Sequence, residues 1–190
     1  MTVSKMAAVG VLLLVCILVV RMVVGPSGAA SSTQGVQSAG TVKGEVYEDA
    51  GLGFALEYPE DWVKAETPEL GADVTFLGPQ RSEFTMSLDV RSDPSRMALD
   101  LYVGRSVRKK LPGFRTDFKL LEQTPLVVSD VEAIKVVYTY REGQYDLTTV
   151  QVTYQLENRK IIVSFCLLSE YYDDVKSAVE NTLNSFHPLG

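Results

Sequence analysis

The chain has 190 residues, of which 46% are hydrophobic, and a formal net charge of −6. Its only cysteines, Cys16 and Cys166, lie in segments of different character, so we expect no disulfide between them and no zinc site. The single histidine, His187, lies beside Pro188 near the C-terminus, and we expect no Ser-His-Asp or Cys-His catalytic arrangement.

The first part of the chain contains an apolar segment, residues 6–24, interrupted only by Arg21. As a helix it would be about 28 Å long, which is close to the thickness of a bilayer core. We therefore interpret residues 1–24 as a transmembrane anchor. A cleaved signal peptide is the alternative, with Lys5 as its basic start and the small residues 28–31 as its cleavage site. Lys5 and Arg21 flank the segment on opposite sides, so charge hardly predicts its orientation.

Residues 25–41 are rich in Gly, Ser, Ala and Gln and predict a flexible tether. Residues 42–190 then form one domain of ordinary size. Because Lys5 and Arg21 precede it, this domain has 18 − 2 = 16 bases against 24 acids, a net charge of −8. Such a charge argues against binding to nucleic acids and against docking on anionic lipids.

The domain begins with four predicted strands. Residues 42–59 indicate two short strands joined at Gly51 and Gly53, which favour turn geometry. Residues 72–79 and 83–93 indicate two more, with Gly78 and Pro79 breaking the chain between them.

Residues 93–113 predict the first helix, with Ser95 as its N-cap and Pro112 at its end. Apolar residues recur through it at helical spacing: Leu99, Val103, Val107 and Leu111. The basic residues 108–110 would lie in its last turn, where cations interact favourably with the helix dipole. We interpret them as a solvated helix end.

The following segment predicts an antiparallel sheet. Residues 148–156 alternate strictly, with an apolar set on one face and a more polar set on the other. Residues 129–133, 141–144 and 157–160 are typical of hairpin turns. Residues 161–168 are apolar on both faces, as in a central strand that is covered on both sides, and Cys166 is interpreted there as a small buried hydrophobe.

A final amphipathic helix over residues 171–186 should pack on this sheet. Its apolar stripe consists of Val175, Ala178, Val179, Thr182, Leu183 and Phe186. Together these elements predict an α+β fold in which helices sandwich an antiparallel sheet.

The only tryptophan, Trp62, follows a strand that ends at Pro59 and lies next to Glu60 and Asp61. Because Pro59 cannot extend the strand ladder, the chain can turn and fold the indole under the sheet. We interpret Trp62 as a core anchor, with an exposed aromatic platform for a ligand as the alternative.

Several stretches together resemble the PsbP-like family: "GFALEYPEDW", "TFLGP", "FTMSLDVRS", "LDLYV", "DVEAIKVVYTY", "TTVQVTYQL" and "IIVSFCLLS" before the closing helix. The family comprises extracytoplasmic domains related to the PsbP extrinsic subunit of photosystem II, with a Mog1/PsbP-like α-β-α sandwich. The resemblance covers nearly the whole domain and implies export across a membrane. PsbP docks through a basic N-terminal region, whereas this chain has an uncharged tether there, which argues against a photosystem role. It more resembles the single-domain anchored members.

The sequence suggests no catalytic, cofactor-binding or metal-binding residues. Two clusters of acidic residues could hold a hard cation, but neither has the spacing of a calcium loop. We interpret both as solvated surface side chains. They are Glu57, Glu60 and Asp61, and Glu170, Asp173 and Asp174.

We therefore expect a non-enzymatic binding or accessory module, anchored in the cell membrane with its domain outside the cytoplasm, or secreted after signal cleavage. The alternative is an accessory subunit that docks on and stabilises a membrane protein complex through a sheet face or the last helix. A hydrolase that uses carboxylates is the third hypothesis.

Overall fold

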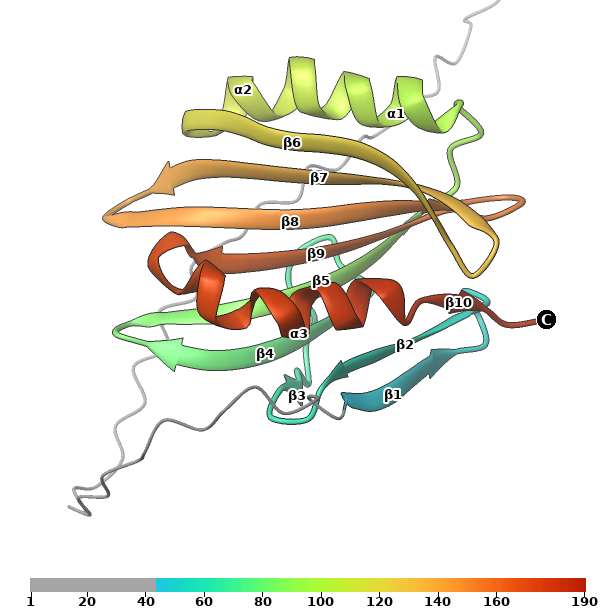
Figure 1. Cartoon of the computed structure of the whole chain (residues 1–190), viewed down its shortest axis with the longest axis horizontal. Coiled ribbons are helices and arrows are strands. Elements are labelled where there is room, and N and C mark those ends of the chain that lie inside the picture. The colour runs from blue at the N-terminus through green and yellow to red at the C-terminus, as the bar shows by residue number, and fades with distance from the viewer. Residues whose placement is uncertain (1–43) are drawn as a thin grey trace, which may run out of the picture.

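The computed structural model describes residues 44–190 as two antiparallel sheets and two helical layers (Figure 1). The predicted anchor or signal peptide (residues 1–24) and the predicted tether (residues 25–41) lie outside the described residues. Within residues 44–190, no helix is long and apolar enough to cross a bilayer.

The large sheet has seven strands and the small sheet three. In spatial order the large sheet contains β3 (Val63–Lys64), β4 (Val74–Arg81), β5 (Phe84–Asp93), β9 (Lys160–Leu168), β8 (Tyr145–Gln155), β7 (Val131–Glu142) and β6 (Thr116–Val128). The small sheet contains β1 (Gly44–Asp49), β2 (Phe54–Pro59) and β10 (His187–Pro188). The helical elements are α1 (Leu99–Arg105), the π-helical segment η1 (Ser106–Lys110), α2 (Leu111–Phe114), the 3-10 turn η2 (Ser169–Tyr171) and α3 (Tyr172–Asn184).

The middle strand β9 is buried along its whole length, as predicted for a strand covered on both faces. Successive side chains of a strand point to opposite faces of the sheet. On one face Phe165 packs edge-to-face on Trp62, with ring centroids 5.4 Å apart. On the other face the Cys166 thiol lies 3.4 Å from the Tyr140 hydroxyl. The fold is therefore an α+β sandwich with the large sheet in the middle.

A stack of aromatic rings joins α3 to both sheets. The ring of Phe186, just after α3, stacks on Tyr154 of β8 at 3.8 Å and on Phe54 of β2 at 5.5 Å. The Tyr154 hydroxyl donates a hydrogen bond to the carbonyl of Leu183, at 2.6 Å. Because Tyr154 is fully buried, this bond gives its only polar group a partner. The stack thus fixes the C-terminal part of α3 against the sheet.

Strand β8 differs from the prediction of one dry and one more polar face. Thr149 and Thr153, on the face predicted to be polar, are almost completely buried. Strand β8 is contacted by both α1 and α3. Both of its faces are therefore covered, and threonine hydroxyls are tolerated under the helical layer.

The first helix begins later and ends later than predicted. Helix α1 starts at Leu99 after Ala98, which provides no side-chain cap, so Ser95 is not the N-cap. The helix continues through the π-helical segment η1 into α2, with Pro112 in the first turn of α2 and the end at Phe114. Because proline has no N–H, the continuous helix lacks one backbone hydrogen bond at this position. The basic residues 108–110 therefore lie in the middle of the helical layer.

Strand β4 continues beyond Gly78 and Pro79, where a break was predicted, to Arg81. Its pairing with β5 shifts register between Leu77 and Gln80, so the two residues form a bulge within the strand. A Cβ atom on Gly78 would lie only 2.5 Å from the Trp62 ring. Trp62 is 6% exposed, so the interpretation of Trp62 as a core anchor is confirmed. The Trp62 indole therefore packs directly against the backbone of Gly78.

The outer edge of β6 is protected against indiscriminate strand pairing. A two-residue turn with positive φ at Ser129 (49°) and Asp130 (64°) joins β6 to β7 and makes Val128 and Val131 a hydrogen-bonded pair. Hydrogen-bonded pairs alternate along such a ladder, so Pro125 occupies a position whose backbone groups face outward. Proline has no N–H to offer there. This edge therefore lacks a regular row of donors.

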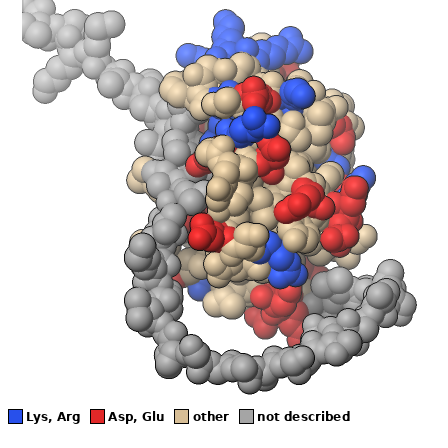
Figure 2. All heavy atoms as spheres, turned by 90° about the vertical axis from the view of Figure 1, so that its left-hand side faces the viewer, with Lys and Arg blue, Asp and Glu red and all other residues tan. Residues whose placement is uncertain are grey.

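Charge is unevenly distributed over the domain. Figure 2 shows acidic side chains spread over most of the visible face, while most of the visible Lys and Arg side chains lie towards the top, on the side of the α1–α2 layer.

We predict that Gly78→Ala lowers the free energy of unfolding by about 1–3 kcal/mol, because the new methyl group forces the indole out of its position. Gly104→Ala is the control: a Cβ there meets nothing within 4 Å, and alanine in a helix should stabilise by about 0.5–1 kcal/mol. Urea denaturation followed by the fluorescence of Trp62 measures both. A Gly78→Ala variant as stable as the wild type would show that the indole is not held against β4.

Candidate functional site

A groove lies at the start of α1, where the helix meets the ends of β6, β7 and β8. Its volume is about 970 Å³, at the upper end of the range of small-molecule sites. Four separate segments line it: the loop before α1 with the start of that helix, β6, β7, and the end of β8 with the turn that follows. No single stretch of sequence therefore marks the groove.

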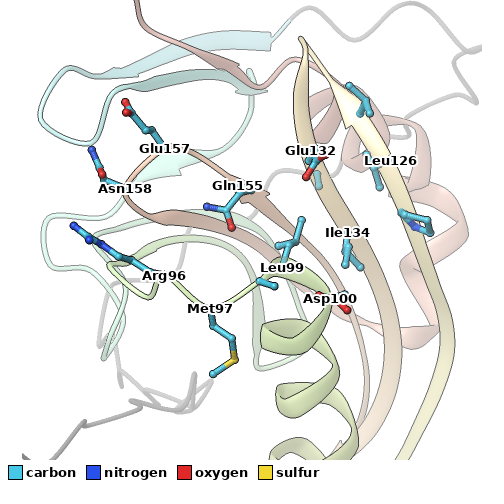
Figure 3. A pocket seen from close by; sticks show the side chains of 14 residues that line it. Arg96, Met97, Leu99, Asp100, Leu126, Glu132, Ile134, Gln155, Glu157 and Asn158 are labelled. Atoms are coloured by element: carbon cyan, nitrogen blue, oxygen red, sulfur yellow. The ribbon is translucent and has the colours of Figure 1, made fainter.

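The groove combines an apolar middle with a polar rim. Figure 3 shows Leu99, Ile134 and Gln155 in the middle, and Arg96, Glu157 and Asn158 at one end. Leu126, Val127 and Pro125 of β6 complete the apolar lining on the other side. No Ser, Thr, Cys, His, Lys or Tyr lines the groove, and its ionisable side chains are three carboxylates and one guanidinium. The arrangement is suited to binding.

One wall of the groove, residues 96–98, is positioned by a buried lysine. The Lys160 ammonium donates hydrogen bonds to the carbonyls of Ser95 (2.9 Å) and Met97 (2.6 Å). It also lies 5.1 Å from the centre of the Tyr102 ring. Lys160 is fully buried, and this burial lowers its pKa, with Asp93 opposing the shift. The lysine therefore ties the loop before α1 to the central strand.

Asp93 holds the same loop from the other side. One of its carboxylate oxygens accepts a hydrogen bond from the backbone N–H of Ser95 at 2.8 Å, and the other accepts from the Tyr102 hydroxyl at 2.6 Å. Burial, followed by the bond to Asp93, raises the pKa of Tyr102. This loop thus has two anchors, one on β5 and one on β9, and the groove wall is fixed before any ligand arrives.

The rim of the groove is predominantly acidic. Three carboxylates, those of Asp100, Glu132 and Glu157, face one guanidinium, that of Arg96. None of these four side chains takes part in an ion pair within residues 44–190. The groove therefore favours a ligand that is apolar along its middle and carries positive charge.

The two acidic clusters noted in the sequence meet at a second, smaller groove. Glu60 and Asp61 from one cluster and Asp174 from the other line a cavity of about 470 Å³ beside Trp62 and Phe165. Glu57, Glu170 and Asp173 are not part of its lining. Within the described part of the chain, no three Asp, Glu, His or Cys side chains are grouped so that they could hold a metal ion.

A buried row of polar side chains lies on the α1 side of the large sheet. The Asp89 carboxylate accepts hydrogen bonds from the hydroxyls of Thr75 (2.6 Å) and Ser87 (3.0 Å), and Thr75 also accepts from the backbone N–H of Glu69. Burial raises the pKa of Asp89, and the two hydroxyls oppose the shift. Burial and then the charge of Asp89 raise the pKa of Glu69.

A carboxylate with a raised pKa can mark an acid–base site. Asp89, however, is 2% exposed, its oxygens are occupied by Thr75 and Ser87, and it lines neither groove. We interpret this row as the means by which the loop between β3 and β4 is held on the sheet. His187, in β10, is exposed and its Nδ1 lies 3.0 Å from the Ser185 carbonyl, away from both grooves.

Comparison with solved structures identifies the architecture. The solution structure of cyanobacterial PsbP (CyanoP) from Synechocystis sp. PCC 6803 superposes with a TM-score of 0.55 at 18% identity, over 82% of this chain and 98% of that one. The chain has the PsbP-like fold. The fold class predicted from the order of the elements and the resemblance to the PsbP-like fold are both confirmed.

Two further structures share this PsbP-like fold. PA94 from Pseudomonas aeruginosa, a protein of unknown function described as a putative regulator, gives a TM-score of 0.56 at 16% identity, over 77% and 98% of the two chains. LpqN of Mycobacterium tuberculosis, involved in cell envelope biogenesis, gives 0.57 at 10% identity, over 77% and 86%. No family model and no curated protein sequence matches the chain. At such identities the likeness concerns the fold.

We predict that Lys160→Met destabilises the domain by about 2 kcal/mol or more, because the carbonyls of Ser95 and Met97 lose their buried donor. Hydrogen exchange of residues 95–98 should also become faster, since the groove wall loses an anchor. Lys176→Met, at an exposed position on α3, is the control and should change neither quantity. Unchanged exchange at residues 95–98 in the Lys160 variant would contradict the role assigned to this lysine.

We also predict that Asp89→Asn stabilises the protein at pH 7. The pKa of Asp89 is higher in the folded protein than in the unfolded chain. The protein therefore loses stability as the pH rises from the pKa of Asp89 in the unfolded chain through its pKa in the folded protein. The amide removes this loss, and the hydroxyls of Thr75 and Ser87 can still bond to it. The advantage should shrink as the pH falls below about 4. Denaturation at a series of pH values, with Asp61→Asn as the exposed control, measures it; a variant less stable at pH 7 would contradict the prediction.

Proposed function

We propose that this protein is a non-catalytic binding module that works outside the cytoplasm, held at a membrane by the apolar segment of residues 6–24. The groove at the start of α1 is its binding site, and its ligand is a segment of a partner protein that carries apolar side chains and at least one Lys or Arg. The observation that carries this proposal is the combination of an apolar groove of about 970 Å³ with three carboxylates and one guanidinium on its rim.

The rigidity of the groove supports this function. Its wall is anchored through Lys160 on β9 and Asp93 on β5, so a ligand would not have to order the loop on binding. Preorganisation of this kind raises affinity because less conformational entropy is lost. On the opposite wall, Val127 is 68% exposed, which leaves apolar surface for a partner side chain to cover.

A location in the cell envelope is supported by two lines of argument. The sequence predicts a membrane anchor or an export signal before the domain. LpqN, which shares the fold, is involved in cell envelope biogenesis. An accessory subunit of a membrane protein complex is a special case of this proposal, in which the ligand segment belongs to that complex.

Photocrosslinking in cells tests the proposal. A photoreactive phenylalanine analogue at Val127, on the groove, should give a discrete adduct with one partner protein. The same analogue at Val63, on β3, is the matched control, because Val63 is also 68% exposed but lies on the other edge strand. No adduct is expected from Val63.

Charge reversal tests the chemistry of the ligand. Glu132→Lys together with Glu157→Lys should abolish the adduct at Val127, since a basic segment would then be repelled from the rim. Glu60→Lys with Glu48→Lys, both at exposed positions away from the groove, should leave it unchanged. Equal labelling from Val63 and Val127, or an adduct that survives the reversal on the rim, would contradict a basic peptide ligand in the groove.

A further inference from the structure

The middle and the end of the α1–α2 layer carry an unusual concentration of positive charge. Residues 101–116 contain five bases and no acid: Arg105, Arg108, Lys109, Lys110 and Arg115. This occurs in a domain whose predicted net charge is −8. Most of the Lys and Arg visible in Figure 2 lie towards the top of the molecule, on the side of the α1–α2 layer.

One of the five bases is committed to the fold. The Arg115 guanidinium forms an ion pair with Glu142 at 2.9 Å and lies 4.2 Å from the centre of the Tyr140 ring. The other four, which we call the basic patch, are Arg105, Arg108, Lys109 and Lys110. None of the ion pairs or hydrogen bonds found within residues 44–190 joins a basic-patch side chain to a carboxylate.

The charges of the basic patch disfavour one another. The pKa of Lys110 is lowered by burial and by the nearby charge of Arg105, while Asp93 only partly offsets these effects. Arg105, Arg108 and Lys109 are exposed, because Val103, Val107 and Leu111 occupy the face of the helical layer that packs on the sheet. An anion in front of the basic patch would relieve this repulsion.

Two large apolar side chains flank the basic patch on the same helical layer. Leu101 is 63% exposed and Phe114 is 68% exposed. Exposed leucine and phenylalanine together with Lys and Arg are typical of helices that lie in the interface of an anionic membrane. The cations then contact lipid headgroups, while the apolar side chains reach the acyl boundary. A polyanion without an apolar layer would leave Leu101 and Phe114 in water.

The net charge of the domain does not prevent such contact. At physiological ionic strength the Debye length is about 8 Å, so acids on distant parts of the surface are largely screened from a bilayer at the α1–α2 layer. The predicted anchor would also keep the domain close to the bilayer: a flexible segment of the length of residues 25–41 has an end-to-end distance of roughly 20–25 Å.

We infer that the basic patch, with Leu101 and Phe114, is a docking surface for anionic lipid headgroups, which lays the α1–α2 layer on the membrane. Each cation near an anionic surface strengthens binding by about fivefold. This surface is separate from the groove, and the inference does not depend on the ligand proposed there.

Energy transfer from the single tryptophan can test this with the full chain. The protein is reconstituted in lipid nanodiscs that contain a dansyl-labelled lipid, either in neutral phosphatidylcholine or with about one-third phosphatidylglycerol. Transfer from Trp62 should differ between the anionic and the neutral discs, and the difference should disappear in high salt, because docking fixes the distance between the indole and the bilayer surface.

A triple variant should remove the difference in energy transfer between the two lipids and weaken docking by roughly 100-fold. It combines Arg105→Gln, Arg108→Gln and Lys109→Gln. The control is a second triple variant, which changes the net charge by the same amount at exposed positions elsewhere and should keep the difference in energy transfer. It combines Arg81→Gln, Lys119→Gln and Lys176→Gln. Equal transfer in neutral and anionic discs for the wild type, or an equal loss in both triple variants, would overturn the inference. Neither result would affect crosslinking at Val127, which tests the groove.

Discussion

The burial of β9 is the constraint on which the rest of the structure depends. All of its side chains, from Lys160 to Leu168, are covered, so both faces of the large sheet need a layer. The stack of Tyr154, Phe186 and Phe54 fixes α3 and the small sheet on one face. The α1–α2 layer covers the other. Apolar residues on both faces of one strand thus determine a three-layer sandwich.

The same strand also positions the candidate site. At its first residue the side chain that points toward the α1 layer is a lysine, and a buried ammonium requires acceptors. The carbonyls of Ser95 and Met97 are these acceptors, and their hydrogen bonds to Lys160 fix the loop before α1 relative to the sheet. The groove is the space left between this loop and the hairpin of β6 and β7. The shape of the groove therefore depends on the hydrogen bonds that satisfy one buried polar group.

The helical layer over this face carries two surfaces of opposite character. At its start, acidic side chains surround an apolar groove; farther along, the cations of the basic patch lie between Leu101, near the start of the layer, and Phe114, at its end. The two proposals assign these surfaces to different partners, a basic protein segment and an anionic lipid surface. Docking of the basic patch on a bilayer would hold the groove close to the membrane, where a partner in the membrane could reach it. Three of the four basic-patch residues, Arg108, Lys109 and Lys110, lie in the π-helical segment η1.

The longer strands, their antiparallel pairing, the central position of residues 161–168 and the core role of Trp62 could be predicted from the sequence, because each depends on a local period or a local turn. The short strands β3 and β10 and the separate small sheet were not predicted. The start of the first helix could not, because Ser95 has the residue type of a cap but its carbonyl is bound by Lys160, which is 65 residues away. Gly78 and Pro79 were predicted to interrupt the strand because glycine and proline occur at strand ends as well as in bulges. The groove left no signal in the sequence, since its lining comes from four segments that only the tertiary structure brings together. Local patterns therefore determined the fold, whereas the surfaces available for binding were decided by contacts between residues far apart in the chain.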